Sequence, residues 1–274
     1  MSTGTLTGTW ALVTGSTRGL GRTIAEWLAR EGAAIIVSGR DEGPVAESVA
    51  AIKAIGVESI GLTADLSDYR EAHQLAEGAL AAVPQIGILV NNAGMSIRGN
   101  FWDVTDEEWE YQVNVNVRAP YILAQHMARH MIERSIRGRI VNISTIGVHA
   151  CHKDAAVYNL AKAGVEAMTR NMAFELGPYG ISVNCVAPGN IAIRPGTTEQ
   201  PWFEDAARAI PYGRVGQSED IAAAVKFFCL PETGFTTGQT LLVDGAHDSY
   251  LTELMPQKGE TGPTPSPVRG MREN

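Results

Sequence analysis

Seven short apolar runs recur along the chain, and each is bounded by glycine, asparagine, aspartate or proline. Continuous apolar runs of this length are typical of strands that are buried on both faces of a sheet. The runs lie at residues 10–13, 34–37, 59–62, 86–90, 139–143, 181–186 and 240–243. They predict the strands of one parallel sheet.

Helical patterns, with apolar residues three and four positions apart, fill the intervals between these runs. Pro44 suits the first turn of one helix, and Ser67 is a candidate N-cap of another. Two longer helices are expected over residues 106–133 and 155–176. The alternation predicts an α/β fold, a doubly wound seven-stranded parallel sheet in a single domain with helices on both faces.

Two stretches depart from the alternation. Residues 188–217 form a long connection with one short helical pattern near residues 203–210, and long connections inside compact domains are often lids. We therefore expect a flap over a substrate, within a domain of residues 1–250. Prolines gather after the last strand, so residues 251–274 are expected to be a proline-rich tail, disordered or lying on a neighbouring subunit.

Composition excludes several classes of protein. The formal net charge of -8 and the lack of a basic run disfavour nucleic acid as a partner. No stretch approaches the ~18–20 apolar residues that span a bilayer, and no secretory signal is visible, so we expect a cytoplasmic protein. The three cysteines have no CxxC spacing, which predicts reduced, mostly buried thiols rather than disulfides or a zinc site.

A glycine-rich turn, TGSTRGLG at residues 14–21, joins the first expected strand to the first helix. Glycines permit a tight turn and a close approach of backbone N–H groups to a diphosphate, which then lies at the positive end of the helix. Because the chain has 29 glycines, a simple strand-to-helix turn is the alternative. The position in the first strand–helix unit favours dinucleotide binding.

Three motifs together resemble the short-chain dehydrogenase/reductase family. The turn matches its TGxxxGxG, NNAG at residues 91–94 follows the fourth strand, and YNLAK at residues 158–162 matches its YxxxK. The resemblance covers about residues 8–246. It implies a Rossmann-like fold, a homotetramer, and hydride transfer between NADP(H) and a carbonyl or secondary alcohol substrate, a small molecule.

The end of the second strand indicates which nicotinamide cofactor binds. NAD-binding members of the family have an aspartate where this chain has Gly39, and Arg40 follows. No carboxylate would repel a 2′-phosphate, and Arg40 and Arg18 could bind one through their guanidinium groups unless they are merely solvated. We therefore expect NADP, with NAD the less favoured cofactor.

The resemblance also implies which residues contact the cofactor. The set comprises Gly15, Thr17, Arg18, Gly19, Leu20, Gly21, Arg40, Asp65, Leu66, Asn92, Ala93, Gly94, Tyr158, Lys162, Pro188, Gly189 and Ile191. The family's PGxxxT has a threonine where this chain has Ile193. One side-chain contact to the cofactor is therefore missing or supplied elsewhere.

Tyr158 and Lys162 are the expected centre of catalysis. Residues four apart share one face of a helix, and a nearby ammonium favours the phenolate form of a tyrosine. Tyr158 would then exchange a proton with the substrate oxygen. Lys162 would also hold the ribose hydroxyls of the cofactor.

Two further catalytic positions follow from the resemblance. The family's catalytic serine lies thirteen residues before the tyrosine, where this chain has Thr145, and threonine keeps the hydroxyl. Ser144 is expected on the opposite face of the strand and would serve only if a bulge shifted the register. Asn116 matches the family's proton-relay asparagine, whereas Asn114 falls on another side of the helix.

Charged and aromatic residues near the expected substrate pocket leave alternatives open. His149 and His152 suit a substrate pocket or a polar surface, and their spacing is a weak indication of a metal site, so no metal is expected. Arg98 and Arg194 could contact an acidic substrate or be solvated. Trp202, Phe203 and Tyr212 could close over an apolar ring or pack the flap down.

The substitutions at Thr145 and Ile193 support one alternative to an enzyme. A nucleotide-binding scaffold or sensor could keep this fold and lose the chemistry. The intact Tyr158, Lys162 and Asn116 favour an active oxidoreductase.

Overall fold

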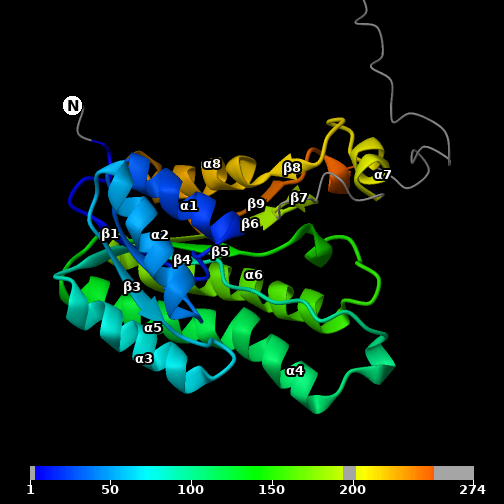
Figure 1. Ribbon diagram of the computed structural model, residues 1–274, viewed down its shortest axis with the longest axis horizontal. Helices are drawn as coiled ribbons and strands as arrows, with labels where there is room; N and C mark the ends of the chain where they lie inside the picture. The colour runs from blue at the N-terminus through cyan, green and yellow to red at the C-terminus, as the bar shows by residue number, and fades with distance from the viewer. Residues whose placement is uncertain (1–3, 194–201, 250–274) are drawn as a thin grey trace, which may run out of the picture.

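The computed structural model describes residues 4–193 and 202–249. Its centre is a sheet of seven strands in the order β3-β2-β1-β4-β5-β6-β9, and neighbouring strands are parallel (Figure 1). The strands are β1 (Trp10–Val13), β2 (Ala34–Gly39), β3 (Ser59–Thr63), β4 (Ile86–Asn91), β5 (Arg139–Ile143), β6 (Ser182–Pro188) and β9 (Thr240–Val243). All seven apolar runs are therefore confirmed as strands of one parallel sheet.

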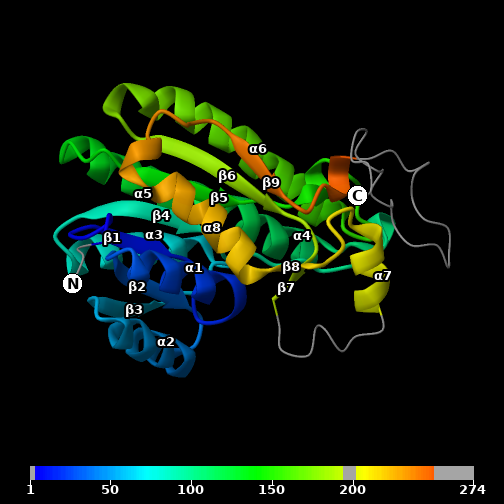
Figure 2. The same ribbon diagram turned by 90° about the horizontal axis from the view of Figure 1, so that it is seen from above.

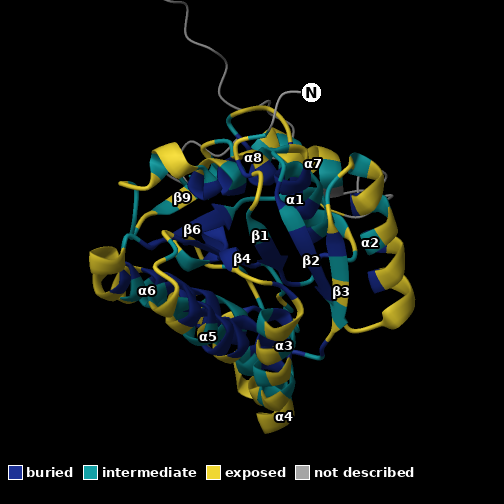
Figure 3. Ribbon diagram, turned by 90° about the vertical axis from the view of Figure 1, so that its left-hand side faces the viewer, coloured by how far each residue is buried: buried dark blue, intermediate teal, exposed yellow. Residues whose placement is uncertain are grey.

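Helices cover both faces of this sheet. The helices on one face are α1 (Gly19–Arg30), α2 (Glu42–Ile55) and α8 (Ser218–Cys229). Those on the other are α3 (Tyr69–Ala82), α4 (Asp106–Val113), α5 (Ala119–Glu133) and α6 (Ala156–Leu176). Figure 3 shows the buried strands between these two layers. The predicted doubly wound α/β fold is confirmed.

The central strands β1, β2, β4 and β5 send alternate side chains into two separate cores. Val13 and Val90 pack with α1 and α8, whereas Leu12 and Leu89 pack with α3 and α5. These four side chains are fully buried, and burying each stabilises the fold by about 1.5–3 kcal/mol. Two apolar layers explain why the strands have no polar alternation.

The predicted helix of residues 106–133 consists of three parts. α4 and α5 are joined by a π-helical segment, η2 (Asn114–Arg118). The expected N-cap Ser67 is wrong by one residue, because the Asp68 carboxylate accepts the Arg70 N–H and caps α3. Helix boundaries commonly shift by this much.

The 188–217 connection carries the helix α7 (Trp202–Ala209) and two short strands, β7 (Ile191–Ala192) and β8 (Gly216–Gln217), which pair in parallel. Two-residue strands have no readable periodicity, so the sequence did not predict them. In Figure 2 these three elements lie beyond the carboxyl ends of the sheet strands. Arg194 and the expected tail of residues 251–274 lie outside the described residues.

Short turns complete the described chain. They are η1 (Phe101–Asp103), η3 (Ile146–Val148), η4 (Gly177–Tyr179), η6 (Pro231–Thr233) and η7 (His247–Ser249). Across residues 4–193 and 202–249, no helix has the length and apolarity that crossing a membrane requires.

Candidate active site

The segments that leave β1, β4 and β5 emerge at the same edge of the sheet. β1 and β4 are neighbours, and the chain leaves them toward opposite faces, since α1 and α5 cover different sides. In doubly wound sheets a crevice opens outside the carboxyl ends at such a point, and ligands bind there. The expected glycine turn follows β1, the NNAG segment follows from β4, and Thr145 follows β5, so these segments leave the sheet at this edge.

The glycine turn leads directly into α1. Gly15 and Gly19 have φ angles of 62° and 53°, a conformation that glycine adopts without strain. A Cβ atom on Gly21 would overlap the Gly15 carbonyl oxygen. Arg18, the N-cap, provides no side-chain cap, and the first turn of α1 has no acidic residue. The free N–H groups of that turn therefore suit an anionic group such as a diphosphate.

Hydrogen bonds tie this turn to the NNAG segment. The backbone N–H groups of Asn92 and Ala93 donate to Thr14 Oγ1, each at 3.0 Å, and Asn92 Nδ2 donates to the Thr14 carbonyl at 2.9 Å. A Cβ on Gly94 would lie 3.3 Å from Lys162 Nζ. Gly94 therefore packs closely against the lysine, with no room for a side chain of its own.

The end of β2 is the expected site for discrimination between the two cofactors. A Cβ on Gly39 would overlap Thr17 Cγ2, so the Thr17 side chain covers the strand end. Arg40 Nη1 lies 3.5 Å from the Tyr111 hydroxyl, the outer limit of a hydrogen bond. Its guanidinium group is therefore only loosely held.

The turn after β3 is fixed by its own side chains. The Asp65 carboxylate accepts the backbone N–H and the hydroxyl of Ser67 at 3.0 and 2.8 Å, and the Asp65 N–H donates to Glu71 at 2.7 Å. Leu66 is buried. Asn114 Nδ2 donates to the Ser67 carbonyl at 2.9 Å, so Asn114 belongs to this turn and not to the catalytic residues.

Asn116 lies in the π-helical segment, and such segments are frequent at functional sites. Its Nδ2 donates to the carbonyls of Met95 and Gln112 at 2.7 and 2.8 Å, and its Oδ1 accepts the Met95 N–H at 3.1 Å. These bonds use both donors of the amide. The side chain therefore holds the segment that follows β4 against the helix.

Tyr158 and Lys162 lie one turn apart on α6. Lys162 Nζ donates to the Ile143 carbonyl at 2.8 Å and lies 5.8 Å from the centre of the Tyr158 ring. Burial lowers the pKa of Lys162 to about 8. The lysine thus links α6 to the end of β5, beside the tyrosine.

Arg98 contributes the positive charge that acts on Tyr158. Burial raises the pKa of Tyr158, and the charge of Arg98 opposes this shift. Arg98 comes from the segment after β4, and its Nη1 donates to the Lys153 carbonyl at 2.9 Å. The sequence predicts Arg98 near the substrate pocket, but it carries no signal that the charge of Arg98 lowers the pKa of Tyr158.

Ser144 and Thr145 face different partners. Ser144 Oγ donates to Glu166 Oε1 on α6 at 2.7 Å. Thr145 Oγ1 accepts the Gly147 N–H at 3.2 Å, and its hydroxyl proton has no acceptor in the described part of the chain. Thr145 is therefore able to donate to a substrate oxygen.

Most of this chain matches known proteins, in both sequence and fold. A family model described as enoyl-(acyl carrier protein) reductase matches residues 15–246. The chain belongs to the short-chain dehydrogenase/reductase family. It is an oxidoreductase of that family, whose members bind a nicotinamide cofactor.

Individual members of this family show the extent of the similarity. The chain is 37% identical over 240 residues to the 3-oxoacyl-[acyl-carrier-protein] reductase FabG of Haemophilus influenzae, which covers 86% of this chain and 96% of that protein. It is 34% identical over 248 residues to gluconate 5-dehydrogenase of Gluconobacter oxydans, covering 88% and 94%. A solved structure of a blue fluorescent protein from a metagenomic library, in complex with NADPH, matches with a TM-score of 0.82 and 30% identity, covering 89% and 99%.

In this short-chain dehydrogenase/reductase, His149 and His152 have separate surroundings. His149 Nε2 lies 3.3 Å from Glu166 Oε1. Burial lowers the pKa of His152, and the charge of Arg98 lowers it further. No group of three or more His, Cys, Asp or Glu side chains that could hold a metal ion occurs among the described residues.

The flap borders the glycine turn. A Cβ on Gly19 would lie 3.2 Å from the Ile193 carbonyl oxygen, and Ile191 packs on the core beside α8. The Gly189 N–H donates to the Val243 carbonyl at 3.0 Å, which fixes the segment that begins at Pro188. Tyr212 is 71% exposed, and the Arg214 guanidinium carbon lies 5.3 Å from its ring centre.

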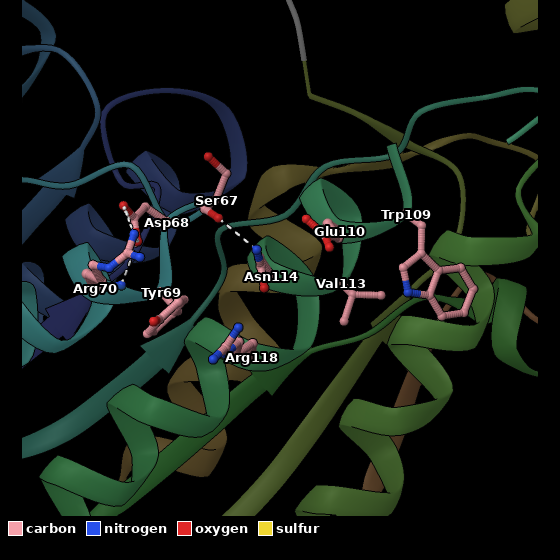
Figure 4. A pocket seen from close by; sticks show the side chains of 9 residues that line it. All are labelled: Ser67, Asp68, Tyr69, Arg70, Trp109, Glu110, Val113, Asn114 and Arg118. Carbon is pink, nitrogen blue, oxygen red and sulfur yellow. Dashed lines mark hydrogen bonds and ion pairs between the residues drawn. The ribbon is translucent and has the colours of Figure 1, made fainter. Parts of the chain in front are cut away.

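A separate cavity of about 550 Å³ lies between the start of α3 and the α4–η2 junction (Figure 4). The Arg118 guanidinium stacks on the face of the Tyr69 ring, and its central carbon is 3.7 Å from the ring centre. Trp109 and Asn114 also line the cavity, and the Asn114 bond to the Ser67 carbonyl is visible there. It contains none of the expected catalytic residues.

Proposed function

We propose that this protein transfers a hydride between NADP(H) and a carbonyl or secondary alcohol substrate. The arrangement of Tyr158, Lys162 and Thr145 beside the glycine turn carries the proposal. Tyr158 and Lys162 share one side of α6, and Lys162 is anchored to the end of the strand that Thr145 follows. These are the positions at which acid–base chemistry is needed at the nicotinamide end of the crevice.

The chain's own residues fit the cofactor. The uncapped start of α1 and the tight turn at Gly15 and Gly19 suit a diphosphate, and Lys162, which lies close to the NNAG backbone at Gly94, would hold the ribose hydroxyls. The nicotinamide supplies the hydride acceptor or donor when it is bound. Asn92 and Ala93 would contact the cofactor. Their backbone is fixed beside the glycine turn, because both N–H groups donate to Thr14 Oγ1.

The protein residues then handle the proton. Tyr158 donates its hydroxyl proton to the substrate oxygen in reduction, and takes it back in oxidation. Thr145 donates a hydrogen bond to the same oxygen, which stabilises the negative charge that develops there. The charge of Arg98 favours the phenolate form of Tyr158 against the effect of burial, and Lys162, 5.8 Å from the ring centre, would add a second positive charge. Asn116 keeps the Met95 segment in place. As the family resemblance implies, it would also relay protons from Lys162 through water.

The surroundings of Gly39 support NADP over NAD. No carboxylate stands at Gly39, and the Arg40 guanidinium is held only by a long contact to Tyr111. It is therefore free to turn toward a 2′-phosphate, with Arg18 as a second cation. One structurally similar protein is in complex with NADPH.

Reduction is the direction that NADP dependence favours. The similar proteins include one described as a reductase and one as a dehydrogenase. Both descriptions are consistent with exchange between a ketone and a secondary alcohol, so both directions should be assayed.

We also infer a homotetramer in the cytoplasm. Tyr121 on α5 and Phe174 on α6 are 51% and 86% exposed, and large exposed apolar residues suit subunit contacts. Cys151 is an exposed free thiol, whereas Cys185 and Cys229 are buried; unpaired cysteines suit a reducing compartment. Light scattering on the purified protein tests the assembly, and fractionation of the source cells tests the location.

The proposed function is tested by titrating the purified protein with NADPH and NADH in parallel, followed by assays with ketones and alcohols. We expect thermal stabilisation by NADPH to exceed that by NADH, and turnover of at least one carbonyl substrate. Stabilisation by NADH alone would overturn the choice of cofactor. Binding without turnover of any ketone or alcohol would point to the scaffold alternative.

A further inference from the structure

Arg98 is held between two loops at the mouth of the crevice. Its Nη1 donates to the Lys153 carbonyl at 2.9 Å, and the next residue, Gly99, donates its N–H to the Asp154 carbonyl at 3.0 Å. The two bonds join the segment after β4 to the segment before α6. Tyr158 follows two residues into α6, so the guanidinium group is placed near the catalytic tyrosine.

The Arg98 guanidinium keeps most of its binding capacity. A guanidinium has five N–H donors. Within the described residues, the Arg98 side chain makes one hydrogen bond, to the Lys153 carbonyl. Within the described ranges, no carboxylate lies within ion-pair distance of it. It is a positive charge that forms no ion pair with the described residues, in a chain of net charge -8.

His152 lies next to this charge. Its Nδ1 and the Oδ1 of Asn159 are buried, and neither has a hydrogen bond of normal geometry within the described residues. The Asn159 side chain nevertheless interacts with His152 and opposes the fall in its pKa. Both buried atoms lie directly against Gly147. A Cβ on this glycine would overlap the His152 ring and lie 2.5 Å from Asn159 Oδ1. Buried polar atoms usually have partners, so this corner of the pocket is suited to a polar ligand group.

The field of Arg98 reaches both groups. Its charge opposes the burial-induced rise in the pKa of Tyr158, and it adds to the burial-induced fall in the pKa of His152. His149 is not part of this set, because it faces Glu166. The mouth of the pocket therefore combines the catalytic hydroxyl with a fixed cation and a neutral imidazole.

We propose that Arg98, assisted by His152, binds an anionic group of the substrate, such as a carboxylate, while the substrate's carbonyl lies at Tyr158. A guanidinium matches a carboxylate through two parallel hydrogen bonds. The proposal rests on the proposed reductase function, and it narrows the substrate class to keto acids and hydroxy acids.

The test compares acids with amides of the same size. Pyruvate, acetoacetate and levulinate place the carboxylate at three distances from the ketone, and each has a neutral primary amide of matched shape. Binding to the NADP⁺-loaded protein and to the protein alone is measured by fluorescence titration, and turnover by NADPH oxidation. For at least one spacing we expect the acid to bind and react about tenfold or more better than its amide, as charge-assisted hydrogen bonds imply.

Arg98 variants identify the subsite. Arg98→Gln should lower the acid-to-amide ratio about tenfold, and Arg98→Lys should retain part of the preference. The ratio cancels any general effect of Arg98 on Tyr158. Arg129, which is exposed on α5, provides the matched control, because Arg129→Gln removes the same charge away from the crevice. A smaller fall is expected for His152→Asn.

Two results would overturn the subsite. One is equal binding of every acid and its amide to the wild-type protein. The other is an Arg98→Gln variant that weakens acid and amide equally, with folding checked by its melting temperature. Failure of the proposed function is recognised separately, because it abolishes NADPH binding or turnover of the amides and of simple ketones, whereas acid binding is measured without turnover.

Discussion

The Ser144 hydroxyl donates a 2.7 Å hydrogen bond to the carboxylate of Glu166, which is 4% exposed. This bond decides which of two adjacent hydroxyls is available to a substrate. Ser144 is committed to a buried carboxylate, whereas Thr145 only accepts a bond from the Gly147 N–H. The chain thus separates a hydroxyl that is bonded to the core from one that is available to donate to a substrate, at two adjacent residues.

Replacing each hydroxyl residue should therefore have a different effect. Thr145→Ala should lower kcat by about 10²–10³-fold, because it removes a hydrogen bond to the reacting oxygen, with a nearly unchanged melting temperature. Ser144→Ala should destabilise the fold by about 1–3 kcal/mol, because the buried Glu166 loses a short hydrogen bond and keeps only the 3.3 Å contact to His149, with a much smaller loss of kcat. Steady-state kinetics and urea unfolding of both variants check this. The reverse pattern would assign catalysis to Ser144.

Tyr158→Phe removes only the hydroxyl. We expect turnover to fall by at least about 10²–10⁴-fold, the usual contribution of a positioned acid or base, while the Kd of NADPH stays within a few-fold of the wild-type value. Tyr179, exposed in η4, provides a control in Tyr179→Phe, which should retain full turnover. Near-normal activity of Tyr158→Phe would remove this residue from the mechanism.

The cofactor preference is expected to depend on Arg40. Arg40→Asp places a carboxylate beside Gly39, so it should repel a 2′-phosphate and accept a ribose hydroxyl. We expect the NADPH-to-NADH ratio of kcat/KM to fall by at least about tenfold. Lys53→Asp, an equal charge change at an exposed position on α2, should leave the ratio unchanged. If both variants keep the wild-type ratio, Arg40 does not bind the phosphate.

Sequence patterns gave the sheet but not every contact in the crevice. Buried parallel strands leave continuous apolar runs, so all seven were predictable, and the motif spacing brought Tyr158 and Lys162 together on one helix. The charge of Arg98 lowers the pKa of Tyr158 because two loops that are distant in the sequence meet at Lys153. Loops have no periodicity, so the sequence pattern does not predict this meeting. The π-helical segment around Asn116 was also missed, because apolar spacing over 106–133 reads as one continuous helix.

Burial of Lys162 should make stability depend on pH in a defined direction. Its pKa falls from 10.5 in the unfolded chain to about 8 in the folded protein. The unfolded state therefore binds more protons between these values, and the lysine's contribution to the free energy of unfolding rises as pH increases through that window. Below pH 8 the full cost of burying the ammonium is present, on the order of 3 kcal/mol.

The variant Lys162→Met isolates this contribution. Burial raises the pKa of Cys185 and Cys229 from 9.0 to about 12, so these thiols lower stability as pH rises above 9 and oppose the lysine. Subtracting the urea-unfolding free energies of Lys162→Met from those of the wild-type protein, from pH 7 to 10.5, cancels Cys229 and the burial effect on Cys185, whose pKa Lys162 changes to a lesser extent than burial does. We expect the difference to move in favour of the wild-type protein as pH rises from 8 to 10.5. A difference that is flat over this range would mean that Lys162 keeps its usual pKa in the fold, supported by its bond to the Ile143 carbonyl.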